Sequence, residues 1–185
     1  MIEDLLLETE ERMQAVIDVA KKELAAVRTG RANPALLNKI IVDYYGTPTP
    51  LNQLASITAP DARLLVVQPW DKNSIKDVEK AILKSELGLT PNVDGNTIRL
   101  PIPQLTEERR KELVKMIRKD IEEKRVAIRN IRRDSNDKLR AAEKNGELPE
   151  DDARRAQDEV QKLTDKYIAE VDRLLAAKEE EILAF

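Results

Sequence analysis

The chain has 185 residues, enough for one large domain or two small ones, and 41% of them are apolar, which suffices for a core. Aromatic residues make up only 3% and charged residues 36%, a balance typical of long amphipathic helices rather than of a β-sandwich, although adaptation to heat also favours it. The net charge of −3 argues against a protein that coats nucleic acid indiscriminately, so any nucleic-acid contact must come from a local basic patch.

The sequence contains neither cysteine nor histidine. Their absence excludes disulfides, thiol nucleophiles, imidazole bases and ordinary zinc sites, and we expect no metal and no cofactor. The opening MIEDLLLETEE has the pattern of neither a signal nor a transit peptide, and no apolar run is long enough to cross a bilayer. We therefore expect a cytoplasmic protein with no membrane partner.

Residues 3–28 have the pattern of one long amphipathic helix without internal proline or glycine. Its apolar side chains recur at steps of three and four: Leu6, Met13, Ile17, Ala20, Leu24 and Val27. Arg28, Thr29 and Gly30 should end the helix, because glycine is favoured just past a helix end and a basic residue suits the last turn.

From Arg31 onward the pattern changes to short β-rich runs separated by proline and glycine. The runs cover residues 39–45, 54–58 and 63–70, followed by a helix after Trp70-Asp71 and a last strand after the Asp94-Gly95 turn. Residues 30–104 therefore predict a small α/β domain.

Two further long helices follow. The first begins after the N-cap Thr106 and runs to about Lys144, and the second begins at Pro149. Helices with single apolar stripes are stable only when they cover one another, so residues 1–29 and 105–185 predict an antiparallel three-helix bundle. The fold class is α+β with two domains, the α/β domain being an insertion. The chain passes between the two domains twice, at Thr29-Gly30 and at Gln104-Leu105. These two connections form a candidate hinge, with a fixed interface as the alternative.

Residues 125–133, RVAIRNIRR, carry the candidate binding site. At helical spacing Arg125, Arg129, Arg132 and Arg133 share one face beside an apolar stripe. The pairs 125/129, 129/132 and 129/133 are like-charged, and each costs about 0.2 to 0.5 kcal/mol. A polyanion could offset that repulsion, and the alternative is a solvated charged face.

Aromatic residues of the α/β segment raise a second question. Tyr44 and Tyr45 alternate across the first strand, so one should face the core and the other solvent, with simple packing as the alternative. Trp70 is either an exposed anchor for a protein partner or a half-buried residue at a strand end.

The chain resembles the bacterial ribosome recycling factor family in a series of linked motifs that covers nearly its whole length. In chain order these are RTGRANP (28–34), DYYGTPTP (43–50), NQLA (52–55), GLTP (88–91), LTEERR (105–110), RVAIRNIRR (125–133), QKLTD (161–165) and EILAF (181–185).

The resemblance implies an L-shaped, tRNA-like molecule that is not an enzyme. Such a factor binds the post-termination 70S ribosome at the A and P sites of the large subunit and, with elongation factor G and GTP, splits it into subunits. It also implies that Arg129, Arg132 and Arg133 contact ribosomal RNA, assisted by Arg28 and Arg31. We expect a monomer.

Two other classes of protein compete with this interpretation. An enzyme would need a reactive site, yet the five glycines form no phosphate loop of the type G-x-x-x-x-G-K-[ST], although carboxylate or lysine chemistry stays open. A coiled-coil adaptor fits the composition equally well. An adaptor would bind no ribosomal particle, and an enzyme would turn over a small molecule unaided.

Overall fold

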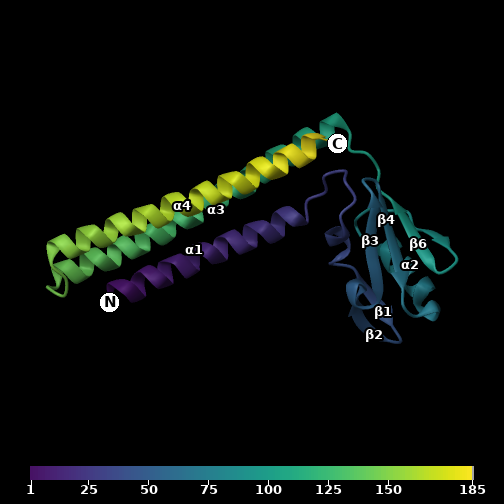
Figure 1. Ribbon diagram of the computed structural model, residues 1–185, viewed down its shortest axis with the longest axis horizontal. Coiled ribbons are helices and arrows are strands. Elements are labelled where there is room, and N and C mark those ends of the chain that lie inside the picture. The colour runs from purple at the N-terminus through teal and green to yellow at the C-terminus, as the bar shows by residue number, and fades with distance from the viewer. Residues whose placement is uncertain (185) are drawn as a thin grey trace. The chain divides into compact units, whose positions relative to one another are not determined.

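The computed structural model describes residues 1–184 and confirms the predicted fold class (Figure 1). Residues cluster into two compact units, one formed by Met1–Leu24 with Lys111–Glu181, the other by Ala25–Arg110 with the residues from Ile182 onward. The domain borders predicted from the sequence, 1–29 with 105–185 and 30–104, are kept as a proposal for the functional domains.

The first unit is a three-helix bundle. Its helices are α1 (Ile2–Ala25), α3 (Glu107–Lys144) and α4 (Glu150–Ala184). With 38 residues α3 is about 57 Å long at 1.5 Å per residue. The predicted N-cap is confirmed, since Thr106 Oγ1 accepts a hydrogen bond from the Arg109 backbone N–H at 3.1 Å.

Contacts between the helices show that α3 is antiparallel to both neighbours. Side chains early in α3 reach late ones in α4, as in Arg118–Glu179. Between α1 and α3, Glu8 pairs with Lys138 and Glu23 with Lys124, so this order is also reversed. Apolar residues at steps of three and four fill the space between the helices, among them Met13, Ile17, Ile117, Ile121, Ile128, Leu139, Val160 and Val171.

One polar layer crosses the bundle core. The hydroxyls of Thr9 on α1 and Ser135 on α3 are 2.6 Å apart and both side chains are buried. Thr9 also donates to the Leu5 carbonyl, so these buried hydroxyls are satisfied.

The second unit is an α/β domain built on a four-stranded antiparallel sheet with the order β3-β4-β6-β5. The strands are β3 (Ala55–Asp61), β4 (Leu64–Pro69), β5 (Asn92–Asp94) and β6 (Thr97–Pro101). Val78 and Ile82 of helix α2 (Ile75–Lys84) join the core formed by the buried side of this sheet. Three short 3-10 helices, Pro34–Leu37, Leu51–Gln53 and Lys72–Ser74, complete the unit.

A separate hairpin pairs β1 (Ile41–Tyr44) with β2 (Thr47–Pro50). The sequence prediction included β1 but not β2, because the TPTP run looked like a turn. Proline is tolerated here because β2 pairs on one side only. Tyr45 and Gly46 form the turn with φ of 50° and 81°, the left-handed values that a two-residue hairpin loop requires.

Helix α1 ends at Ala25, three residues earlier than predicted. Leu24 is its last buried side chain, so no apolar contact holds a further turn. The following residues belong to the α/β unit: Thr29 is buried and Gly30 has φ +81°, a conformation that a Cβ would strain.

Candidate nucleic-acid interface

The predicted arginine face lies on α3 and is built as its spacing requires. Ile128 and Ile131 are buried in the bundle, which sets the rotation of the helix and leaves the arginines beside the apolar stripe. The side chain of Arg125 is 21% exposed and that of Arg129 is 42% exposed. Arg125 is therefore less accessible to a partner than Arg129.

Carboxylates hold the first two arginines. Arg125 Nη2 lies 2.6 Å from Asp172 Oδ1 on α4, and its Nη1 lies 2.9 Å from Glu122 Oε2. The other oxygen of Glu122 accepts from Arg129 Nη1 at 3.4 Å. The hydrogen bond from Arg125 holds the pKa of Glu122 below its ordinary value, so the carboxylate stays charged between the two guanidinium groups.

The last two arginines have neutral partners instead. Arg132 Nη1 donates to the amide oxygen of Gln161 at 3.2 Å, and Arg133 Nη1 donates to that of Asn130 at 3.5 Å. Within residues 1–184, no ion pair is found for either guanidinium group. Among the described residues, no carboxylate therefore compensates the positive charges of Arg132 and Arg133.

Part of the predicted repulsion is resolved inside the helix. Glu122 lies three residues before Arg125 and seven before Arg129, and it bridges this like-charged pair. Glu122 is at helical spacing from Arg125, but the residues three and four positions from Arg129 include no acid, so the contact with Arg129 was not predictable from that spacing. The pairs that join Arg129 to Arg132 and Arg133 have no such bridge among the described residues.

Arg28 and Arg31 belong to the other compact unit. The guanidinium group of Arg28 donates to the carbonyls of Leu87 at 3.4 Å and Pro103 at 3.5 Å, so it ties three segments of the α/β unit together. The backbone N–H of Arg31 donates to Thr29 Oγ1 at 3.4 Å.

The candidate hinge residues also lie in that unit. A Cβ added at Gly30 would approach Leu105 Cγ to 3.4 Å, so the two connections run close together there. Gln104 is exposed and Leu105 is half-buried, while Thr29 is buried. The geometry at Gly30 admits glycine readily and other residues only under strain.

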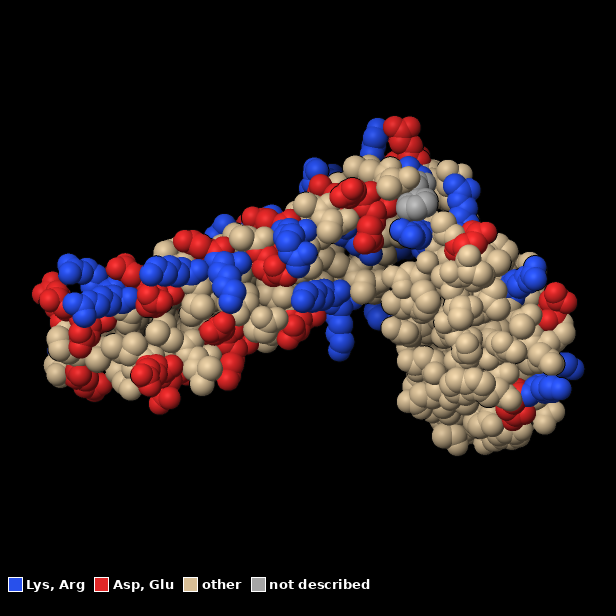
Figure 2. All heavy atoms as spheres, in the orientation of Figure 1, with Lys and Arg blue, Asp and Glu red and all other residues tan. Residues whose placement is uncertain are grey.

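Two segments of the α/β unit, which contribute both to its core and to its surface, differ from the rest of the chain in charge. Residues 44–60 and 64–70 contain no charged side chain, although 36% of the whole sequence is charged. We call them the neutral segments, and most of the visible face of this unit in Figure 2 is uncharged. Trp70 is 67% exposed and Tyr45 72%, so the hypothesis of a half-buried tryptophan was wrong.

Asp71 orders the aromatic side chains near Trp70. The hydroxyls of Tyr44 and Tyr45 both donate to Asp71 Oδ2 at 3.0 Å, and Oδ1 accepts from the Asn73 backbone N–H. These hydrogen bonds lower the pKa of Asp71 and raise the pKa of both tyrosines. The expectation that one tyrosine faces the core and the other solvent was wrong: Tyr44 is half-buried, Tyr45 is exposed, and their rings meet edge to face with centroids 4.6 Å apart. Tyr45 lies in the turn with φ 50°, so the alternation of a strand does not extend to it.

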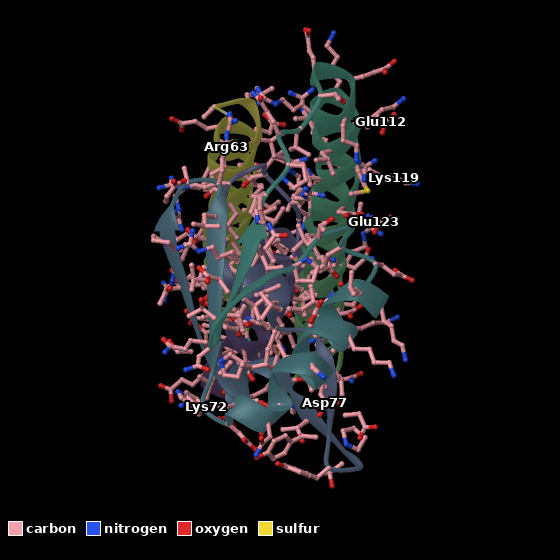
Figure 3. The ribbon with its side chains drawn as sticks, turned by 90° about the vertical axis from the view of Figure 1, so that its right-hand side faces the viewer. Arg63, Lys72, Asp77, Glu112, Lys119 and Glu123 are labelled. Atoms are coloured by element: carbon pink, nitrogen blue, oxygen red, sulfur yellow. The ribbon has the colours of Figure 1, made fainter. Side chains whose placement is uncertain are left out.

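Charged residues border the neutral segments. Figure 3 labels Arg63 at one end of β4, Lys72 beyond its other end and Asp77 on α2. An uncharged centre with a charged rim is the usual distribution in a protein–protein interface, and a phosphate backbone would find no cation within the neutral segments.

Among residues 1–184, no cluster of acidic side chains is arranged to hold a metal ion, and no helix is long and apolar enough to cross a membrane.

Fold and surface together define a class: a helical-bundle protein that carries an α/β insertion and presents uncompensated arginines on its longest helix. The chain matches the family model described as ribosome recycling factor over residues 20–183. It belongs to the ribosome recycling factor family.

Relatives and solved structures agree along the whole chain. The ribosome-recycling factor of Syntrophomonas wolfei is 61% identical over 183 residues and that of Bacillus subtilis 56%, each with 99% of both chains covered. A solution structure of the ribosome recycling factor has a TM-score of 0.81 at 44% identity, covering 100% of this chain and 98% of the other. A second match, with a TM-score of 0.70, 52% identity and 99% of both chains covered, is a model of the Thermus thermophilus factor and Escherichia coli elongation factor G bound to the E. coli post-termination complex.

Proposed function

We propose that this chain recycles ribosomes. It binds the post-termination 70S ribosome at the A and P sites of the large subunit and, with elongation factor G and GTP, splits it into subunits so that translation can restart. The observation that carries this proposal is the pair of uncompensated arginines, Arg132 and Arg133, on a rigid bundle in a chain of this family. The matching complex with elongation factor G supports the choice of partner.

The bundle is the anchor. Ribosomal RNA presents phosphate oxygens, and the planar guanidinium group grips them with two hydrogen bonds and stacks on exposed bases. Arg132 and Arg133 contribute full charge, whereas the RNA must compete with Glu122 for Arg129, and with Glu122 and Asp172 for Arg125. Arg28 and Arg31, next to the connection at Thr29-Gly30, assist in binding RNA. For Arg28 this requires that the guanidinium group give up its hydrogen bonds to the carbonyls of Leu87 and Pro103.

The α/β domain transmits the push of elongation factor G to the ribosome. Thr29, Gly30, Gln104 and Leu105 form the hinge, and elongation factor G pushes the domain about it to break the bridges between the subunits. The neutral segments are the contact for this protein partner, because the core of such contacts is depleted in charge and enriched in tryptophan. Trp70 is the anchor of that contact.

The factor works as a cytoplasmic monomer without a cofactor and catalyses no reaction itself. Its sequence has no phosphate loop, so the translocase hydrolyses the GTP.

A splitting assay tests the function. Light scattering of post-termination 70S ribosomes should fall when the chain, elongation factor G and GTP are all present, and should stay constant when any one is omitted. Subunit release by the chain alone, or no release with all three components, would contradict the proposal. An adaptor would leave scattering unchanged throughout.

A further inference from the structure

The contact between α3 and α4 repeats every seven residues. Arg118 pairs with Glu179, and Arg125 pairs with Asp172. Along α3 the arginine has advanced by seven positions, and along the antiparallel α4 the acid has moved back by seven. Seven residues are close to two helical turns, so successive members of each series lie on the same side of their helix.

The same step predicts a third pair. Seven residues after Arg125 comes Arg132, and seven before Asp172 comes Asp165. Both residues carry the charges that a third ion pair would need. Nevertheless, no ion pair joins them in the part of the chain that the structure describes.

Gln161 takes the place of that ion pair. Its amide nitrogen donates to Asp165 Oδ1 at 2.8 Å, and its amide oxygen accepts from Arg132 Nη1 at 3.2 Å. Only this orientation of the amide fits, because a carboxylate needs a donor and a guanidinium group needs an acceptor. Gln161 and Asp165 are four residues apart on α4, so the helix itself brings them together.

We propose that Gln161 is a positioning residue that keeps Arg132 available for RNA. It occupies the acid that would otherwise pair with Arg132, and it holds the guanidinium group through a neutral acceptor. A phosphate then need not displace a carboxylate to reach Arg132, as it must at Arg125. This inference rests on the proposed function, because it requires Arg132 to bind ribosomal RNA.

Replacing the amide tests the proposal. Gln161→Met keeps the length of the side chain and its helix propensity but removes both hydrogen bonds. Asp165 is then free to pair with Arg132, and an exposed ion pair of this kind should weaken the affinity for purified large ribosomal subunits about two- to fivefold. The thermal unfolding of the bundle should stay unchanged.

A second substitution separates positioning from simple loss of a surface residue. With Asp165→Asn added to Gln161→Met, no carboxylate remains to capture Arg132, so the affinity should recover most of what Gln161→Met alone loses. In an Arg132→Ala background, Gln161→Met should have no effect on binding.

The outcomes also distinguish this inference from the proposed function. If Arg132→Ala weakens binding but Gln161→Met does not, or if Asp165→Asn fails to restore it, the positioning role is wrong and the RNA-binding face stands. If Arg132→Ala itself leaves binding unchanged, both are wrong. A loss with Gln161→Met that Asp165→Asn restores supports both.

Discussion

Replacing Arg132 and Arg133 together by alanine should weaken binding to the large ribosomal subunit by at least ~30-fold, because each charge-assisted contact contributes about 1 to 3 kcal/mol. Both guanidinium groups have only amide partners among the described residues, so their removal leaves no buried acid unpaired. The fold should therefore tolerate the change, and the unfolding temperature should shift by no more than a few degrees. Pelleting with purified subunits measures the affinity.

A matched control lies on the same helix. Arg118 is 63% exposed, so its removal subtracts one positive charge from α3 as well, but this guanidinium group is paired with Glu179. Arg118→Ala should change the affinity less than twofold. Because the control removes one charge and the double variant two, a control loss about half as large in free energy would mean that net charge, rather than the open pair of arginines, determines binding.

Replacing Trp70 by alanine should slow ribosome splitting at least ~10-fold while leaving the affinity for the large subunit unchanged. Exposed tryptophans at the centre of protein contacts often contribute 2 kcal/mol or more to binding. Trp70 is 67% exposed, so the substitution creates no cavity in the α/β domain. Splitting is followed by light scattering at fixed elongation factor G and GTP, and subunit affinity is measured by pelleting.

Leu83 provides the control for this second experiment. It lies on α2 outside the neutral segments and is 58% exposed, so Leu83→Ala removes apolar surface of the same domain. Splitting should proceed at the normal rate with this variant. A normal rate with Trp70→Ala would remove the tryptophan from the proposed contact, and a parallel loss of subunit affinity would place it in ribosome binding instead.

The helices of this protein are predictable because their signals are repeated over many turns. Apolar residues at steps of three and four continue through α3, and Thr106 begins that helix as expected. The sequence predicted an element wrongly where a local preference, such as that of proline for turns, was overridden by packing in the folded chain. The hairpin strand β2 was missed because its prolines suggest a turn. Helix α1 ends early because Leu24 is its last buried side chain, and the buried residues that follow belong to the α/β unit.

The candidate site was predicted as a set of residues but not as a network of contacts. Helical spacing placed Arg125, Arg129, Arg132 and Arg133 on one face of α3. Two of their partners, Asp172 and Gln161, lie on α4 and depend on the register of α3 against α4, which the sequence does not state directly. The signal for the contacts with α4 was the seven-residue spacing of Arg118, Arg125 and Arg132 on α3 against Glu179, Asp172 and Asp165 on α4. Within α3, the spacing of Glu122 and Arg125 by three residues was a second signal.

The sequence left the exposure of Trp70 open because residues 64–67 are apolar throughout, which hides the alternation of buried and more exposed residues along β4. A more informative signal was the absence of charge from residues 44–60. In a chain with 36% charged residues, such a stretch indicates either a surface with a specific partner or a buried segment. In the structure its first part, residues 44–50, belongs to the β1–β2 hairpin and is exposed or half-buried, which favours the surface.

The salt dependence of binding to purified large subunits tests the central claim most directly. Each phosphate neutralised contributes about 0.7 to 0.9 to the slope of log K against log salt. Arg132 and Arg133 alone predict a slope near ~−1.5, and all four arginines of the face predict about −3. A slope between these values in the unmodified chain, which becomes shallower by about 1.5 in the Arg132→Ala, Arg133→Ala variant, is the expected result. A slope near zero, or one that the double substitution leaves unchanged, would contradict it.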